Sequence, residues 1–116
     1  MQHEVKKITL IVNELVTLML LNGAEEVDVK IKRSKETTCI DLIHSKSRYE
    51  EDFIEKLRYS LNTQRQCEVE GYYWQLCGDD DSGEELFLVG AMVDQADVEV
   101  VDGNLHIKLI RRDVCR

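Results

Sequence analysis

The most unusual chemical group in the sequence is a carboxylate inside an apolar segment. Glu14 lies in residues 13–23 (Asn-Glu-Leu-Val-Thr-Leu-Met-Leu-Leu-Asn-Gly), where nearly every neighbour is apolar. A buried charge is costly unless it is paired or hydrogen-bonded. Glu14 therefore needs water, a partner such as Lys6, Lys7 or the backbone, or a functional role.

A second group of carboxylates could hold a cation. Residues 78–85 read Gly-Asp-Asp-Asp-Ser-Gly-Glu-Glu. They lack the alternating order and the sixth-position glycine of a calcium-binding loop. Ser82 and Glu85 have the spacing of a helix capping box. We interpret the segment as a solvated loop that precedes a helix, and we expect no metal site.

The nucleophilic and metal-ligating residue types show no pattern of their own. No Gly-x-Ser-x-Gly, Walker loop or His-Glu-x-x-His sequence occurs. The cysteines contain no Cys-x-x-Cys pair and match no zinc spacing. We expect free thiols, as is usual in the cytoplasm. The residues concerned are His3, His44, His106, Cys39, Cys67, Cys77 and Cys115.

The only dense aromatic cluster is Tyr72, Tyr73 and Trp74. Core packing is the default explanation for such a cluster. An interface is the alternative, because tyrosine and tryptophan are enriched at binding hot spots. The sequence leaves both explanations open.

Composition limits the classes of partner. The chain has 116 residues, 43% of them hydrophobic, and a formal net charge of -8. This length predicts one domain, spanning residues 1–116. The acidic balance argues against nucleic acid and against an anionic membrane surface. The first apolar run is interrupted by Asn13 and Glu14, so it resembles neither a signal peptide nor a membrane span. We expect a cytoplasmic protein.

The first half of the chain predicts a helix, a hairpin and a second helix. Apolar residues at helical spacing predict a helix over 4–21 that ends at Gly23, with a last turn apolar almost all round that must be covered on several sides. Strict alternation predicts strands over 26–33 and 37–44, joined as an antiparallel hairpin. Tyr49, Phe53, Leu57 and Leu61 then repeat every four residues and predict a surface helix.

The second half predicts further helices and a closing hairpin. A short helix is expected over 69–76, and another after the acidic loop, with its end within 94–97. Residues 98–101 and 105–110 predict strands joined at Asp102-Gly103, a hairpin signal. His106 should face solvent or a partner. The order predicts an α+β fold: a two-layer sandwich with a mixed sheet of about four strands and helices on one face. The buried side of the later helix is expected to contain Leu86, Leu88, Val89, Met92 and Val93.

Three local sequences, in this order, resemble a known family. Residues 14–17 (Glu-Leu-Val-Thr) followed by Gly23 are similar to the N-box helix of the GHKL superfamily, which includes sensor histidine kinases, DNA gyrase and anti-sigma-factor serine kinases. Residues 83–89 are similar to its late glycine box, and residues 98–112 to its closing hairpin. The resemblance implies a GHKL-like fold, and it implies a general-base role for Glu14. The pocket it implies contains Glu14, Thr17, Leu18, Gly83 and Leu86.

The chain departs from the family where ATP would bind. The position of the magnesium-binding asparagine is Leu18, which offers no oxygen ligand to a hard cation. No glycine occurs between Gly23 and Gly71, so the first glycine box with its adenine-binding aspartate is absent; its place is taken by residues 44–47 (His-Ser-Lys-Ser). Acidic residues also crowd the helix terminus that would hold the phosphates.

These departures predict a degenerate GHKL-like domain that is not an enzyme and has no cofactor. Its function would be regulatory, in a bacterial cell, through contact with a protein partner or with itself as a homodimer. The first alternative is an ATP- and magnesium-binding anti-sigma-type serine kinase with an atypical pocket. The second is an unrelated α+β interaction domain.

Overall fold

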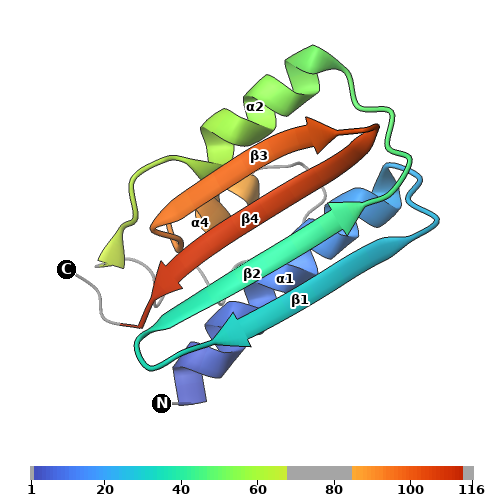
Figure 1. The fold of residues 1–116 in the computed structure, drawn as a ribbon. Helices are drawn as coiled ribbons and strands as arrows, with labels where there is room; N and C mark the ends of the chain where they lie inside the picture. The colour runs from blue at the N-terminus through green and yellow to red at the C-terminus, as the bar shows by residue number, and fades with distance from the viewer. Residues whose placement is uncertain (1, 68–84, 114–116) are drawn as a thin grey trace.

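The computed structural model describes residues 2–67 and 85–113, drawn in colour in Figure 1. The helix expected over 69–76, the aromatic cluster Tyr72, Tyr73 and Trp74, and Gly83 lie outside these residues. The elements are α1 (Gln2–Leu21), β1 (Val27–Arg33), β2 (Thr37–His44), α2 (Glu51–Leu61), α4 (Glu85–Gly90), β3 (Gln95–Val101) and β4 (Asn104–Arg112).

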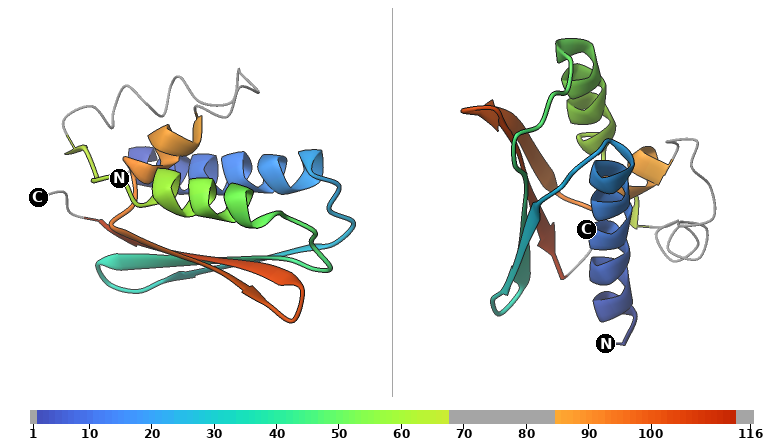
Figure 2. Two further views of the ribbon diagram at one scale, coloured as in Figure 1. Left: turned by 90° about the horizontal axis from the view of Figure 1, so that it is seen from above. Right: turned by 90° about the vertical axis from the view of Figure 1, so that its right-hand side faces the viewer.

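The described elements form two layers. The strands make one four-stranded sheet in the order β1-β2-β4-β3, and the helices cover one of its faces (Figure 2). The two-layer α+β architecture is therefore confirmed. The expectation of a mixed sheet is wrong, because all three strand pairs are antiparallel. β2 and β3 run in the same direction, but β4 lies between them, so no parallel pair forms.

Both hairpins follow from local sequence. In β1 and β2, Val29 pairs with Leu42 on the helix side of the sheet, and Lys30 pairs with Asp41 on the open side. β2 alternates between half-buried and buried residues along its whole length. The second hairpin turns at Asp102 and Gly103, which both have positive φ, of 53° and 80°. Two successive positive φ values give a turn whose twist matches the strands.

Helix α1 supplies much of the core. Ile8, Ile11, Leu15 and Met19 are all buried against the sheet. The helix ends as expected, because Gly23 adopts a φ of 85° and Ala24 N–H donates to Met19 O at 3.0 Å.

The expectation that the apolar last turn of α1 is covered on several sides is wrong. Leu20 and Leu21 are 57% and 65% exposed. The sheet lies under one side of α1 and α4 packs against another. A side chain that points away from both of these neighbours stays in water.

Several boundaries differ from the sequence expectation. Tyr49 precedes α2 rather than opening it, and α4 ends at Gly90, so Met92 and Val93 are buried in the following turn. β3 starts at Gln95, where a helix end was expected. The reason is that Asp94 N–H donates to Ile110 O at 2.8 Å, which brings the chain into the sheet at once.

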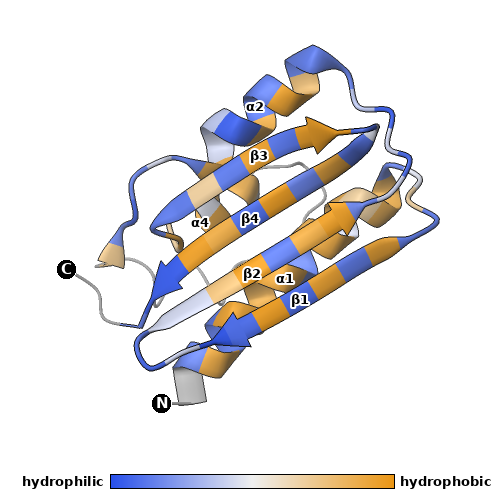
Figure 3. Cartoon of the chain, in the orientation of Figure 1, coloured by the Kyte–Doolittle hydropathy of each residue, from blue (hydrophilic) through white to orange (hydrophobic). Residues whose placement is uncertain are grey.

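The face of the sheet away from the helices is polar. Figure 3 shows hydrophilic and hydrophobic residues alternating along the strands, as a sheet covered on one side requires. One row across this open face has alternating charges: Lys30 pairs with Asp41, Asp41 with Lys108, and Lys108 with Asp97. His106 lies on the same face, opposite Ile43, and is half-buried.

Candidate functional site

The sequence-predicted pocket residues that the structure describes lie on α1 and α4, which pack against each other. Glu14 is 8% exposed. Thr17 is half-buried, and Leu18 and Leu86 both pack against the hydrophobic core. Glu14 and Leu18 are four residues apart and therefore share one face of α1. Leu18 and Leu86 thus pack against the same hydrophobic core from two helices that touch, whereas Gly83 lies outside the described residues.

The buried carboxylate of Glu14 is only partly satisfied by the protein around it. A carboxylate this poorly exposed is stable when its charge has a partner. Glu14 takes part in a polar interaction of its own. Its Oε1 atom is nevertheless buried without a hydrogen-bond partner, so the fold satisfies this carboxylate only in part.

Leu18 occupies the position where the resemblance places a magnesium ligand, and its side chain packs on the core instead. Neither neighbouring asparagine replaces it. Asn22 Nδ2 donates to Leu18 O at 2.8 Å and so caps the helix, and Asn13 is exposed. Within residues 2–67 and 85–113, no group of three or more His, Cys, Asp or Glu side chains could hold a metal ion.

At the end of β2, where the resemblance places the adenine-binding box, buried His44 pairs with half-buried Tyr49. His44 is 3% exposed and points to the helix side of the sheet. Its Nδ1 lies 2.8 Å from the Tyr49 hydroxyl. The two rings meet edge to face at 5.1 Å between centroids, and Tyr49 stacks on Phe53 of α2 at 5.0 Å. These rings fill the space between the end of the sheet and α2.

Burial keeps both members of this pair neutral. Desolvation lowers the pKa of His44 below its ordinary 6.5. Desolvation also raises the pKa of Tyr49 to about 12. The Tyr49 hydroxyl therefore keeps its proton near neutral pH and can donate it to Nδ1 of a neutral imidazole.

The turn after His44 is fastened to the last hairpin. Lys46 has a φ of 57°, and its N–H donates to Asn104 Oδ1 at 2.9 Å. The N–H and the hydroxyl of Ser47 both donate to Gly103 O, at 2.9 and 3.1 Å. The backbone N–H groups of Lys46 and Ser47 are thus used inside the protein. They are not available to bind a ligand.

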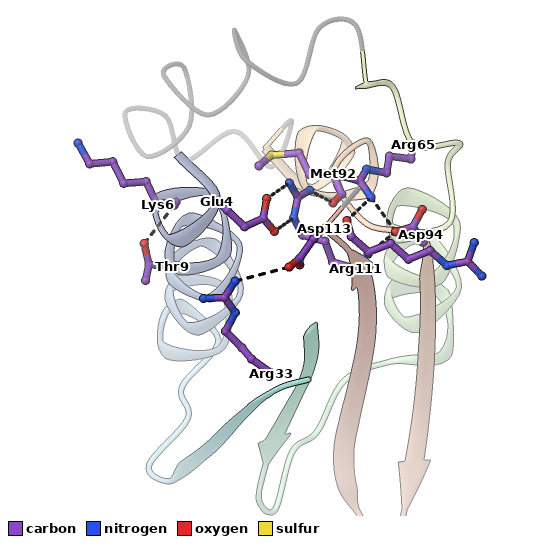
Figure 4. A network of polar contacts seen from close by, with 10 residues as sticks. Glu4, Lys6, Thr9, Arg33, Arg65, Met92, Asp94, Arg111 and Asp113 are labelled. Carbon is purple, nitrogen blue, oxygen red and sulfur yellow. Dashed lines mark hydrogen bonds and ion pairs between the residues drawn. The ribbon is translucent and has the colours of Figure 1, made fainter. Parts of the chain in front are cut away.

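Sequence reasoning missed a buried ion pair at the opposite end of the sheet (Figure 4). Arg111 is 1% exposed. Its Nε and Nη2 donate to the two carboxylate oxygens of Glu4 at 2.8 and 2.9 Å, and its Nη1 donates to Met92 O at 2.6 Å. A signal was present in the sequence, because Arg111 continues the buried alternation of Leu105, Ile107 and Leu109 along β4.

A second arginine strengthens the same end. Arg65 Nη1 donates to Asp94 Oδ2 at 2.7 Å and to Arg112 O at 2.8 Å. Arg112 N–H donates to the same Asp94 oxygen at 2.6 Å. All these contacts are internal to the chain, so both arginines act as structural ties.

The expectation of free thiols holds for Cys39 but is wrong for Cys67. Cys39 is free and half-buried in β2. Cys67 is disulfide-bonded. A disulfide is typical of oxidising compartments, so this bond counts against the cytoplasmic location that the net charge suggested.

The open face of the sheet also forms a broad hollow of about 660 Å³. It is lined by charged residues of all four strands, among them Lys30, Asp41, Asp97 and Lys108. None of the candidate pocket residues lines this hollow. Within the described residues, no helix combines the length and the apolar character that crossing a bilayer requires.

Comparisons with protein-family models, with curated proteins and with solved structures found no match to this chain. The functional argument therefore rests on the residues and their geometry.

Proposed function

We propose that this chain is a degenerate GHKL-like domain that works through protein contact and not through catalysis. The order of its elements supports this proposal. A helix, an antiparallel hairpin, further helices and a closing hairpin follow one another along the chain, and this is the order on which the sequence resemblance rests. The partner is a protein or a second copy of the chain, and the setting is regulatory and bacterial.

The observation that carries the proposal is the His44–Tyr49 pair. An adenine-binding box needs a carboxylate to accept from the adenine amine, and glycines that let the backbone approach the ligand. Here the end of β2 presents a buried neutral imidazole bonded to Tyr49. The following N–H groups of Lys46 and Ser47 are bonded to the last hairpin. Side chains and internal bonds occupy the place that a base would need.

The phosphate side supports the same conclusion. Leu18 is an apolar residue packed on the core, and a hard cation requires oxygen ligands. The sequence before α4 is strongly acidic. Negative charges at this place oppose a triphosphate unless a cation offsets them.

The first alternative is an ATP-binding serine kinase of the anti-sigma type with an atypical pocket. The burial of Glu14 next to Leu18, on a helix that packs against α4, favours it. In that case Glu14 would act as the general base. The second alternative is an α+β interaction domain unrelated to the GHKL superfamily, and it shares the protein-contact function.

Calorimetric titration with ATP, with and without magnesium, tests the proposal. We expect no saturable heat and no thermal stabilisation. Saturable binding that Glu14→Gln abolishes would establish the kinase alternative, which a phosphotransfer assay would then follow. Asn13→Ala is the matched control, because Asn13 is the exposed polar neighbour of Glu14 on the same helix. Binding that both variants retain would also contradict the proposal, since ATP would then use another site.

A further inference from the structure

Strand β1 is a free edge of the sheet. Among the strands in residues 2–67 and 85–113 it pairs only with β2, and residues 28–33 are all exposed. α1 covers the helix side of β1 only in part, since Val29 and Ile31 remain 41% and 44% exposed. Figure 1 shows β1 along the outer margin of the sheet. An unpaired edge of this kind is a template for another strand.

The hydrogen-bonding groups of alternate β1 residues point away from the sheet. Ser34 N–H donates to Thr37 O, and Glu26 O accepts from Ser45 N–H. Antiparallel ladders alternate by two residues, so the even-numbered residues of β1 bond to β2. Val27, Val29 and Ile31 therefore direct their N–H and C=O groups outward, along the free edge.

The charges of this strand change sign in the middle. Residues 26–32 read Glu-Val-Asp-Val-Lys-Ile-Lys, with acids before Val29 and bases after it. A twofold axis at Val29 sets the strand antiparallel to its own copy. That register pairs Glu26 with Lys32, Asp28 with Lys30, Val27 with Ile31, and Val29 with Val29 of the second copy. Every charged residue then meets its opposite, and every apolar residue meets an apolar one.

The neighbouring twofold registers place like charges together. An axis at Asp28 sets two copies of Asp28 opposite each other, and an axis at Lys30 does the same for Lys30. An axis at Val27 sets Glu26 against Asp28, and an axis at Ile31 sets Lys30 against Lys32. Charges on an edge strand usually prevent sheet pairing. On this edge they disfavour those four registers and favour the one centred on Val29.

The same register continues the charge pattern of the open face. The row Asp97, Lys108, Asp41, Lys30 alternates in sign across the sheet and ends with a cation at the free edge. In the register centred on Val29, Asp28 of the second copy lies next to Lys30 and extends the alternation. On the other face, Val29 and Ile31 gain apolar cross-strand neighbours.

From these observations we infer that a second copy of this chain pairs with β1 edge to edge. The dimer has an isologous interface and a continuous sheet of eight strands, four from each copy, with the helices on one face. The inference deepens the proposed function, because it names the partner and the surface. It rests on that function only for the claim that the domain works through protein contact.

The first test is the mass of the purified chain by sedimentation equilibrium. We expect the mass of two chains, and Val29→Pro should return the mass of one. Proline removes the outward N–H of Val29 and leaves the bonds of Asp28 and Lys30 to β2 intact. Val29→Ile keeps that N–H and is the matched control, which should remain dimeric. A monomeric wild-type chain would overturn the inference, and so would a folded Val29→Pro variant that remains a dimer.

A charge exchange decides the matter even if Val29→Pro fails to fold. Glu26 and Lys32 suit this test, because neither has a charged partner in β2. Lys32 lies opposite Cys39, and the Glu26 carbonyl oxygen accepts a hydrogen bond from Ser45 N–H. Glu26→Lys or Lys32→Glu alone creates two repulsive contacts per dimer. Each should raise the dimer dissociation constant roughly tenfold or more. A mixture of the two variants restores both attractive contacts and should form a heterodimer.

Lys56→Glu on the exposed face of α2 controls for net charge and should not change the dissociation constant. Single variants as dimeric as the wild type, or a mixture that stays monomeric, would contradict the proposed register. The calorimetric titration with ATP is an independent measurement. A dimer that binds ATP refutes the proposed function and leaves this inference standing, whereas a monomer without ATP binding does the reverse.

Discussion

Arg111 and Glu4 form a bidentate ion pair across 107 residues of sequence. The pair joins the first turn of α1 to the C-terminal end of β4. The Arg111 side chain is only 1% exposed. A third guanidinium nitrogen bonds to Met92 O. One side chain thus ties together the helix layer, the sheet and the turn that follows α4.

Glu4→Gln should destabilise the protein by about 3 kcal/mol, because it leaves the Arg111 charge buried without its counter-charge. Urea unfolding measures this change as a lower midpoint at an unchanged slope. The double variant Glu4→Leu with Arg111→Met should lose less stability than the sum of its two single changes, since it removes both charges together. Additive losses would show that the two side chains do not interact.

The His44–Tyr49 pair should make stability depend on pH. Because the folded pKa of His44 is lowered below 6.5, the unfolded chain binds a proton first as the pH falls. The free energy of unfolding should therefore decline as the pH falls from 6.5 to the lowered pKa. His44→Gln should remove that part of the slope in urea titrations at several pH values. An unchanged slope would mean that another group causes it.

Gly90→Ala should destabilise the protein by about 1–3 kcal/mol, as overpacking does. A Cβ at this position would clash with the backbone carbonyl oxygen of Ser60 and lie close to the Thr63 hydroxyl. Helix propensity alone predicts the opposite sign, because alanine favours helices more than glycine. Thr63→Ala in the same chain should not rescue stability, since the Ser60 carbonyl remains. Thermal melting of the single and double variants distinguishes the two expectations.

Leu18→Asn should not create ATP binding. The substitution supplies the amide that the proposed GHKL-like site would require at this position, yet the hydrogen-bonded His44–Tyr49 pair still lies at the end of β2. Because Leu18 packs on the core, the polar amide should cost about 1–3 kcal/mol of stability. Calorimetry with magnesium and ATP, together with urea unfolding, measures both effects. Saturable binding by this variant would contradict the expectation and would show that a single amide at position 18 is enough for ATP binding.

Periodicity in the sequence predicted the elements whose side chains alternate or repeat strictly. The hairpin of residues 26–44 and the Asp102-Gly103 turn were predicted correctly, because alternation and turn chemistry are local properties. The direction of pairing between the two hairpins was not. β4 lies between β2 and β3 because segments that are distant in the sequence pair with each other. A local sequence pattern does not predict such a strand order.

The site was harder to predict than the fold. The resemblance placed Glu14 and Leu18 in one pocket; in the structure Glu14 is buried and Leu18 packs on the core. The His44–Tyr49 pair was missed, because the hydrogen bond depends on Tyr49 lying before α2 and not inside it. Arg111 was missed because a charged residue is normally expected in solvent. Its position in the alternation nevertheless places it on the buried face of β4.

The position of β4 has a consequence for synthesis of the chain on the ribosome. β4 contains residues 104–112, yet it is the inner strand that joins the two hairpins. Until those residues emerge, β2 has an unpaired second edge and β3 has no partner at all. Until residues 104–112 have been made, a nascent chain therefore exposes strand edges, which favour aggregation. Loss of residues 104–112 would leave β3 and the β1–β2 hairpin without a common sheet.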